Sequence, residues 1–174
     1  MDLHLVHAND PILKQKCQEF DFKNPSVDPI EFAQALTALM YAHNGLGLSA
    51  NQTGFNIRVF AMRGDPQNFV CFNPRIVWVG ERRVTLEEGC LSYPGLIIPV
   101  SRFRDIRVRF YGANQQIFTQ KFTDLSSRVF QHEMMHLDGE NFWASTSRTV
   151  FEMAKKKCNI KNVTFNGLIL DKTS

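Results

Sequence analysis

The stretch that most limits what this chain can fold into is residues 129–141, with the sequence VFQHEMMHLDGEN. It contains the pattern H-E-x-x-H as His132, Glu133 and His136. Positions i and i+4 of a helix lie on one face, so both imidazoles can bind one metal ion. Glu133 then lies beside the ion, where a carboxylate can carry protons. The pattern alone is equally typical of an ordinary amphipathic helix that holds two histidines.

The residues around the pattern favour a helix. Side chains recur at spacings of four, three and four, which defines one helical face: Leu125, Val129, His132 and His136. Asp124 is expected to cap the N-terminus and Gly139 to end the helix. Because a catalytic metal needs a third protein ligand and an open position, two histidines do not complete a site.

Length and composition are those of one globular domain. The 174 residues are 44% hydrophobic and 21% charged, which suits a sizeable core, so we expect a single domain over residues 1–174. The net charge of +3 is too small to indicate nucleic-acid binding by itself. The N-terminus lacks a signal-peptide pattern and no apolar run reaches the length of a membrane span. We therefore expect the protein to be located in the reducing cytoplasm.

The cysteines are widely spaced and form no C-x-x-C pair: Cys17, Cys71, Cys90 and Cys158. In a reducing compartment this spacing argues against a disulfide framework or a structural zinc knuckle. Three of the four are expected to be small buried hydrophobic residues.

One clear helical pattern comes first and is followed by a run of strand patterns. A helix is predicted after Asp28, with Pro29 in its first position and Glu31 closing a capping box, and it ends at residues 44–45. From residue 56 onward the hydrophobic period is two. Strands are predicted over 57–62, 69–72, 75–79, 83–87, 96–100, 106–111 and 117–122, the last two joined as a hairpin.

The chain ends with weaker signals. Thr149 and Glu152 form a second capping box before a short helix of about 150–158, and a last strand is predicted over 163–170. No parallel strand–helix–strand alternation is visible. The fold class is therefore α+β, with antiparallel sheets surrounding a central metal-binding helix.

Two stretches have the composition of site loops. Residues 45–52 (GLGLSANQ) hold Gly45 and Gly47, which indicates a tight turn or close approach of another backbone. It is not a phosphate loop, because the Lys-Ser/Thr ending is absent. A helix end that leads into a strand is the plain alternative. In residues 88–95 (EGCLSYPG), Cys90 follows Gly89 at a strand end. One thiolate and two imidazoles leave a tetrahedral position open, as in catalytic sites.

Three segments, GLGLSANQ, EGCLSYPG and QHEMMHLDG, occur in this order and resemble the three signature motifs of the peptide deformylases. The resemblance runs from the first helix to Gly139. It implies an enzyme that removes the N-formyl group from the initiator methionine of nascent polypeptides and releases formate. It also implies one Fe2+ per chain, which Zn2+, Ni2+ or Co2+ can replace, held by Cys90, His132 and His136.

The resemblance assigns further roles. A metal-bound hydroxide attacks the formyl carbon, with Glu133 as general base and then general acid. The Gln52 amide and the Leu91 N–H stabilise the oxyanion. Four residues are expected to contact the substrate: Gly45, Gly47, Gly89 and Val129. We also expect His132 and Leu125 to line the methionine pocket.

One position departs from the family pattern H-E-x-D-H, because Met135 stands where the aspartate is usual. The missing carboxylate is expected to belong to an outer shell, paired with Arg102, which then needs another partner such as Asp105 or solvent. Residues 145–174 match no family motif. Their lysines, at 155–157 and 161, are read as a solvated helix end or as a contact with ribosomal RNA.

Two other functions stay open at this point. A zinc endopeptidase of the H-E-x-x-H type would take its third ligand downstream, from Glu140 or Glu152. A catalytically weak paralogue would bind N-formylmethionyl peptides without turnover; Met135 is the only residue that suggests this function. In every case we expect a monomer with no membrane or DNA partner.

Overall fold

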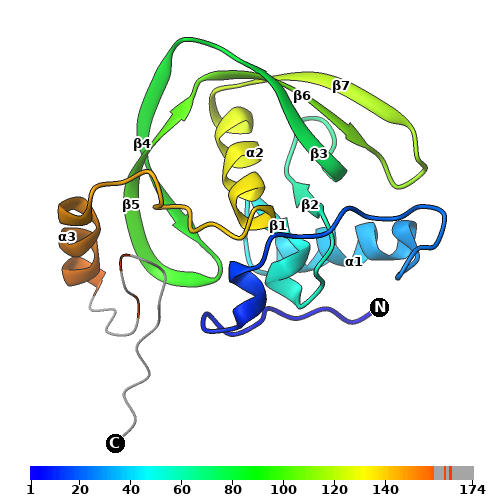
Figure 1. Ribbon diagram of the computed structural model, residues 1–174, viewed down its shortest axis with the longest axis horizontal. Helices are drawn as coiled ribbons and strands as arrows, with labels where there is room; N and C mark the ends of the chain where they lie inside the picture. Colours follow the sequence, from blue (N-terminus) through cyan, green and yellow to red (C-terminus); the bar gives the residue numbers. More distant parts are fainter. Residues whose placement is uncertain (159–162, 164, 166–174) are drawn as a thin grey trace, which may run out of the picture.

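The computed structural model describes residues 1–158, 163 and 165, and it has a mixed α+β architecture (Figure 1). The helices are α1 (Pro29–Ala42), α2 (Asp124–Leu137) and α3 (Arg148–Cys158), with short 3-10 turns η1 (Pro11–Lys14) and η2 (Ala50–Thr53). The strands are β1 (Gly47–Ser49), β2 (Val59–Met62), β3 (Phe69–Val79), β4 (Arg83–Cys90), β5 (Tyr93–Phe103), β6 (Asp105–Tyr111) and β7 (Ile117–Thr123).

The strands form two antiparallel sheets around α2. One has five strands in the order β1-β2-β3-β6-β7, and the other is the β4–β5 hairpin. Figure 1 shows α2 enclosed between the two sheets, and the helix contacts strands of both. The predicted fold class is confirmed. Among the described residues, no helix combines the length and the apolar character that a membrane span requires.

Aromatic packing holds α2 against the larger sheet. Phe130 is fully buried, and its ring lies 5.0 Å from that of Phe60 on β2 and 5.7 Å from that of Phe122 on β7. Buried aromatic side chains of this size dominate core energetics. The face of α2 that carries the H-E-x-x-H pattern is therefore held in place by packing on its opposite face.

The ends of α1 and α2 differ from prediction in the caps. Asp28 caps α1 as expected, but the Glu31 carboxylate accepts a hydrogen bond from the Met1 amino group at 2.6 Å and does not close a capping box. Asp124 does not cap α2: Thr123 is the N-cap, and Asp124 pairs with Arg104 at 2.8 Å. In both cases a partner distant in sequence is a stronger attraction for the carboxylate than the local N–H groups.

The strands predicted between residues 57 and 122 are present, with corrected bounds. The two strands predicted over 69–72 and 75–79 are one strand, β3, whose pairing with β6 shifts register at Asn73 and Pro74. Asn73 adopts a left-handed φ of +49° and its amide is hydrogen-bonded to both backbone groups of Phe20. The irregularity is a bulge inside a continuous strand. The β6–β7 hairpin is confirmed, and β1 was not predicted.

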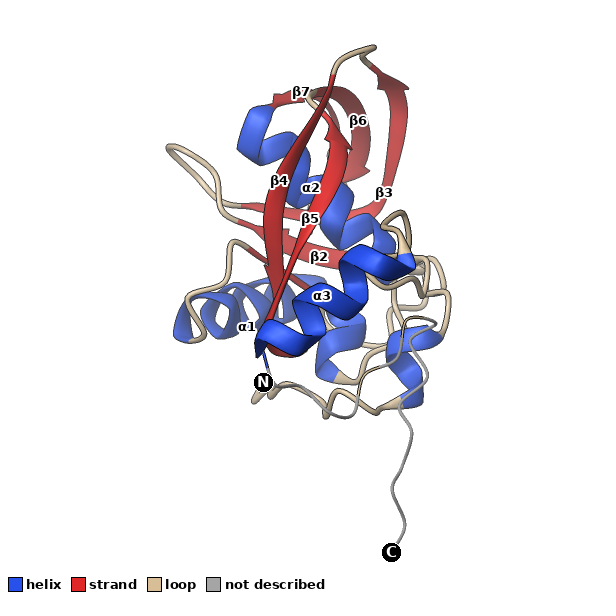
Figure 2. Ribbon diagram, turned by 90° about the vertical axis from the view of Figure 1, so that its left-hand side faces the viewer, coloured by secondary structure: helices blue, strands red, loops and turns tan. Residues whose placement is uncertain are grey.

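The C-terminal part of the described chain covers β5. Trp143 and Phe151 are fully buried against β5, where α3 lies beside the hairpin (Figure 2). The helix predicted over 150–158 is confirmed, but Ser147 caps it in place of Thr149. Most of the predicted strand 163–170 lies outside the described residues. Of the three cysteines expected to be buried, Cys158 is half-exposed, because it is the last residue of α3.

Candidate metal centre

The structure brings one thiol and two imidazoles together. Cys90 is the last residue of β4, while His132 and His136 lie one turn apart on the face of α2 that points toward it. Their ligand atoms all lie within 4.8 Å of one another, and Cys90 Sγ is 3.1 Å from His136 Nε2. No other such group of three occurs in the part of the chain that the structure describes. Glu140 and Glu152, the alternative third ligands of an endopeptidase, are not in the group.

Electrostatics favours the thiolate. Desolvation alone raises the pKa of the Cys90 thiol, but the charges and hydrogen bonds of His136 and His132 outweigh it and hold the pKa well below its ordinary value. Desolvation lowers the pKa of His132, yet its hydrogen bonds with Cys90 and Glu88 raise it to about 10. A thiolate with two imidazoles is a donor set that suits Fe2+, Zn2+, Ni2+ or Co2+. The residues present therefore fit the implied ion.

Glu133 lies beside the three donors and is almost completely buried. Its Oε2 accepts a hydrogen bond of 2.7 Å from Ser49 Oγ, at the end of β1. Desolvation raises the pKa of Glu133 above its ordinary value, while His132 and His136 oppose that shift. A carboxyl group with a raised pKa exchanges protons more readily near neutral pH.

The 3-10 turn η2, which follows β1 directly, presents Gln52 to the same site. The Gln52 side chain accepts from the Ser49 backbone N–H at 2.9 Å and donates from Nε2 to Ser92 Oγ at 2.9 Å. The same Nε2 lies 3.6 Å from Cys90 Sγ. Asn51 Nδ2 donates to the His136 carbonyl at 2.7 Å, which connects η2 to the end of α2. Ser49, Asn51 and Ser92 were given no role by sequence reasoning, whereas Gln52, Cys90 and His136 were.

A pocket of about 700 Å³ opens in front of these groups. Its lining includes every residue predicted to bind substrate or to stabilise the oxyanion: Gly45, Gly47, Gln52, Gly89, Leu91 and Val129. Leu125, expected in the methionine pocket, also lines it. His43, at the C-terminal end of α1, is exposed and also lines the pocket. The volume is within the range of small-molecule sites, roughly 300–1,000 Å³.

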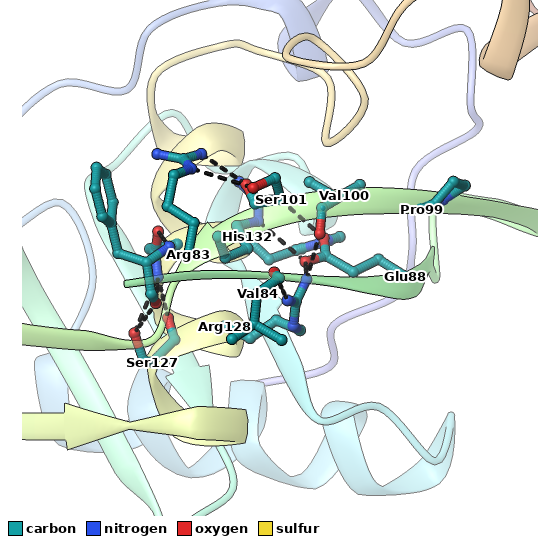
Figure 3. Close-up of polar contacts among 12 residues, drawn as sticks. Arg83, Val84, Glu88, Pro99, Val100, Ser101, Ser127, Arg128 and His132 are labelled. Carbon is teal, nitrogen blue, oxygen red and sulfur yellow. Dashed lines mark hydrogen bonds and ion pairs between the residues drawn. The ribbon is translucent and has the colours of Figure 1, made fainter. Parts of the chain in front are cut away.

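Behind the donors, Glu88 contacts the His132 ring and two arginines, Arg102 and Arg128; Figure 3 labels Glu88, His132 and Arg128. Glu88 accepts from His132 Nδ1 at 3.0 Å, from Arg102 Nη2 at 2.8 Å and from Arg128 Nη1 at 2.6 Å. Desolvation alone raises the pKa of Glu88, but hydrogen bonds from His132 and Arg102 lower it to about 2. The residue is a carboxylate that fixes the His132 ring and leaves its Nε2 for an ion.

The partner expected for Arg102 was wrong. Arg102 is buried and pairs with Glu88, and its Nη1 lies 2.7 Å from the sulfur of Met135. Asp105 instead faces Lys121, with 3.6 Å between Oδ1 and Nζ. Met135 therefore does occupy the place where a carboxylate would meet Arg102. No sequence pattern indicated the contacts of Glu88 with Arg128 and His132, because these partners lie 40 and 44 residues away.

Comparison with known proteins identifies the family. The family described as polypeptide deformylase matches residues 3–151, most of the chain. The chain belongs to the polypeptide deformylase family. A peptide deformylase from Pseudothermotoga lettingae is 36% identical over 134 residues, which cover 76% of each chain. Peptide deformylase 1B of Arabidopsis thaliana, chloroplastic/mitochondrial, is 31% identical over 160 residues, 89% of this chain and 58% of the plant protein.

Solved structures of peptide deformylases share the fold. The Synechococcus elongatus enzyme in complex with actinonin superposes with a TM-score of 0.83 at 26% identity, over 95% of this chain and 89% of that one. A plant peptide deformylase, PDF1B, gives a TM-score of 0.82 at 28% identity, over 90% and 87%. The predictions of the deformylase family, of its fold and of an enzyme are confirmed.

Proposed function

We propose that this protein removes the formyl group from N-formylmethionyl peptides, with one Fe2+ held by Cys90, His132 and His136. The observation that carries the proposal is the meeting of a favoured thiolate and two imidazoles with buried Glu133 at one pocket. When bound, the ion acts as a Lewis acid and lowers the pKa of a water it holds from 15.7 to about 7. Zn2+, Ni2+ or Co2+ would replace Fe2+ in the same donor set.

Glu133 is the proton carrier in this proposal. As general base it takes a proton from the water that attacks the formyl carbon. As general acid it gives that proton to the departing amine nitrogen when the C–N bond breaks. Formate and a free N-terminal amine result. The hydrogen bond from Ser49 to Oε2 leaves Oε1, which faces Gly47 on β1, for this exchange.

The negative charge that develops on the formyl oxygen requires fixed donors. We assign these to the Gln52 amide, held by Ser49 and Ser92, and to the Leu91 backbone N–H. One such donor contributes about 10²–10³ in rate. Because its carbonyl oxygen is fixed by the Ser49 N–H, the Gln52 side chain presents its NH2 group toward Cys90.

The substrate backbone has a free strand edge available. β1 is the edge strand of the five-stranded sheet, and Gly45 and Gly47 line the pocket beside it. An extended peptide adds to such an edge through main-chain hydrogen bonds. Gly89 would leave room on the β4 side, and Val129, with Leu125 and His132, would contact the methionine side chain.

The test is formate release from formyl-Met-Ala-Ser by protein purified without oxygen and loaded with Fe2+. The expected result is turnover by the wild type and its loss in Glu133→Ala at equal metal content. Absence of turnover at full metal occupancy would contradict the proposal. It would favour a protein that binds formylated peptides without hydrolysis, for which the Met135–Arg102 contact is the supporting observation.

The expected surroundings are also proposals. We propose a cytoplasmic monomer of one domain, to be checked by cell fractionation and light scattering. For the lysines in the last turn of α3, residues 155–157, we favour a solvated helix end over a ribosomal contact, because cations near a helix C-terminus are favourable. Co-sedimentation with ribosomes that is lost on Lys-to-Ala changes there would reverse that choice.

A further inference from the structure

Arg128 connects three elements with one buried guanidinium. The side chain comes from α2 and is 6% exposed. Nη1 donates to Glu88 and, at 2.9 Å, to the carbonyl oxygen of Val100 on β5, while Nη2 donates to the carbonyl oxygen of Val84 on β4 (Figure 3). A planar guanidinium can reach three acceptors in fixed directions, which a lysine cannot. Arg128 therefore fixes the β4–β5 hairpin relative to α2.

This connection matters because the three donors of the metal centre are divided between the same two elements. Cys90 ends β4, and both histidines are on α2. Arg128 lies one helical turn before His132, on the same face. Both residues contact Glu88, Arg128 at Oε1 and His132 at Oε2. The orientation of the Glu88 carboxylate, and with it the His132 ring, thus depends on Arg128.

Neutralising Glu88 does not explain Arg128. Arg102 already pairs with Glu88 through two nitrogens, at 3.0 and 2.8 Å. Burying a second guanidinium carries a desolvation penalty that can exceed the Coulomb attraction it gains. Since Met135 contributes no carboxylate, two arginines face one glutamate in this network. What Arg128 contributes beyond Arg102 is its hydrogen bonds to both strands of the β4–β5 hairpin.

We propose that Arg128 is a positioning residue for the metal centre. It holds the hairpin that carries Cys90 at the correct distance from α2 and orients Glu88 behind His132. This inference rests on the proposed metal-binding function. It concerns the affinity and the geometry of the ion's site, and it assigns Arg128 no contact with substrate.

The experiment compares Co2+ binding by the wild type with that of Arg128→Met, which keeps the aliphatic stem and loses all the hydrogen bonds. Competition with a chelator gives the dissociation constant, and the visible absorption of bound Co2+ reports coordination geometry. We expect Arg128→Met to weaken binding by about 10–100-fold and to change the absorption band. Arg128→Lys, which keeps the charge but not the fork, should recover only part of the affinity. If Arg128→Met does not fold, Arg128→Lys takes its place in the comparison with the wild type.

Ser127→Ala is the matched control. Ser127 is the preceding residue on α2, and its hydroxyl donates to the Phe103 carbonyl at the far end of β5, away from Glu88. It should leave the Co2+ dissociation constant within about threefold of the wild type. It removes two neutral hydrogen bonds, the one to Phe103 and one accepted from Gln131 Nε2 at 2.9 Å, and neither involves Glu88 or a metal donor. Glu88→Gln combined with Arg128→Met should weaken binding by less than the product of the two single effects, because both act through one carboxylate.

The outcomes are separable. If Arg128→Met binds Co2+ as tightly as the wild type, with the same absorption band, the inference is wrong and the proposed function stands. If Ser127→Ala weakens binding as much as Arg128→Met, Arg128 has no special role and the inference is again wrong. If the wild type itself binds no divalent ion, the proposed function fails first and the inference fails with it.

Discussion

The sharpest prediction concerns Gly47, whose replacement by alanine should displace the proposed proton carrier. A Cβ built at Gly47 would lie 2.8 Å from Cδ and 2.9 Å from Cγ of Glu133, with Oε1 closer still. All three of the nearest atoms belong to Glu133. Gly47 is not among the residues with a positive φ, so alanine introduces no backbone strain there. The perturbation acts on one side chain.

The size of the displacement follows from these distances. Carbon atoms in contact lie about 3.5–4.0 Å apart, so the Glu133 carboxyl group must retreat by about 0.7 Å or more. A misplacement of about 1 Å in a reacting group can cost about 10²-fold in rate. We therefore expect Gly47→Ala to lower kcat/KM by about 10²-fold, with an overpacking cost of about 1–3 kcal/mol in stability. Metal content should not change, because none of the nearest atoms belongs to a metal donor.

The assay is formate release under Fe2+ saturation, with metal content and thermal unfolding measured on the same samples. Gly80→Ala is the control. This glycine also has an ordinary φ and lies between β3 and β4, and the three atoms nearest to an added Cβ, from Asp105 and Trp78, are 3.3 Å or more away. The control should keep its activity. If Gly47→Ala kept kcat/KM within about threefold while remaining folded and loaded, the position of Glu133 would not limit the reaction. The role proposed for Glu133 would then be wrong.

Three further predictions concern the residues around the donors. Met135→Asp places a carboxylate oxygen where the sulfur now lies 2.7 Å from Arg102, and should raise stability by about 1.5 kcal/mol, seen as a higher Tm; an unchanged or lower Tm would contradict it. The pKa of Glu88 is about 2 against an ordinary 4.5, which corresponds to about 3 kcal/mol of stability that is complete above pH 4.5 and lost as the pH falls toward 2. The difference in unfolding free energy between the wild type and Glu88→Gln should therefore shrink from pH 7 to pH 3, and an equal difference at both would refute this. In protein stripped of metal, iodoacetamide should modify Cys90 well before Cys71, whose pKa burial raises far above the ordinary value, and bound metal should protect Cys90; mass spectrometry that finds Cys71 modified first would show the reverse.

Local spacing determined much of this protein. His132, Glu133 and His136 read as one helical face because their spacing is a property of the helix itself, and Phe130 packs on the other side of that helix as an amphipathic pattern requires. The β6–β7 hairpin was equally visible, since alternation and turn residues lie close together in the chain.

Predictions failed where a residue had a partner far away in the chain. Glu31 and Asp124 have the residue types of helix caps, yet the Met1 amino group and Arg104 hold their carboxylates. Residues 73–74 read as a break between strands. In the fold they form a bulge, because the Asn73 amide binds the backbone of Phe20, which lies 53 residues earlier.

The sequence by itself determined which residue types the site contains: one cysteine, two histidines, a glutamate and a glutamine in three short motifs. Only the tertiary structure decided how they are held. The Ser49 hydroxyl meets Glu133 across 84 residues, and Arg128 meets Glu88 across 40. Such contacts leave no periodic trace, because they depend on how the β4–β5 hairpin and α2 pack, and that packing is set by the whole core.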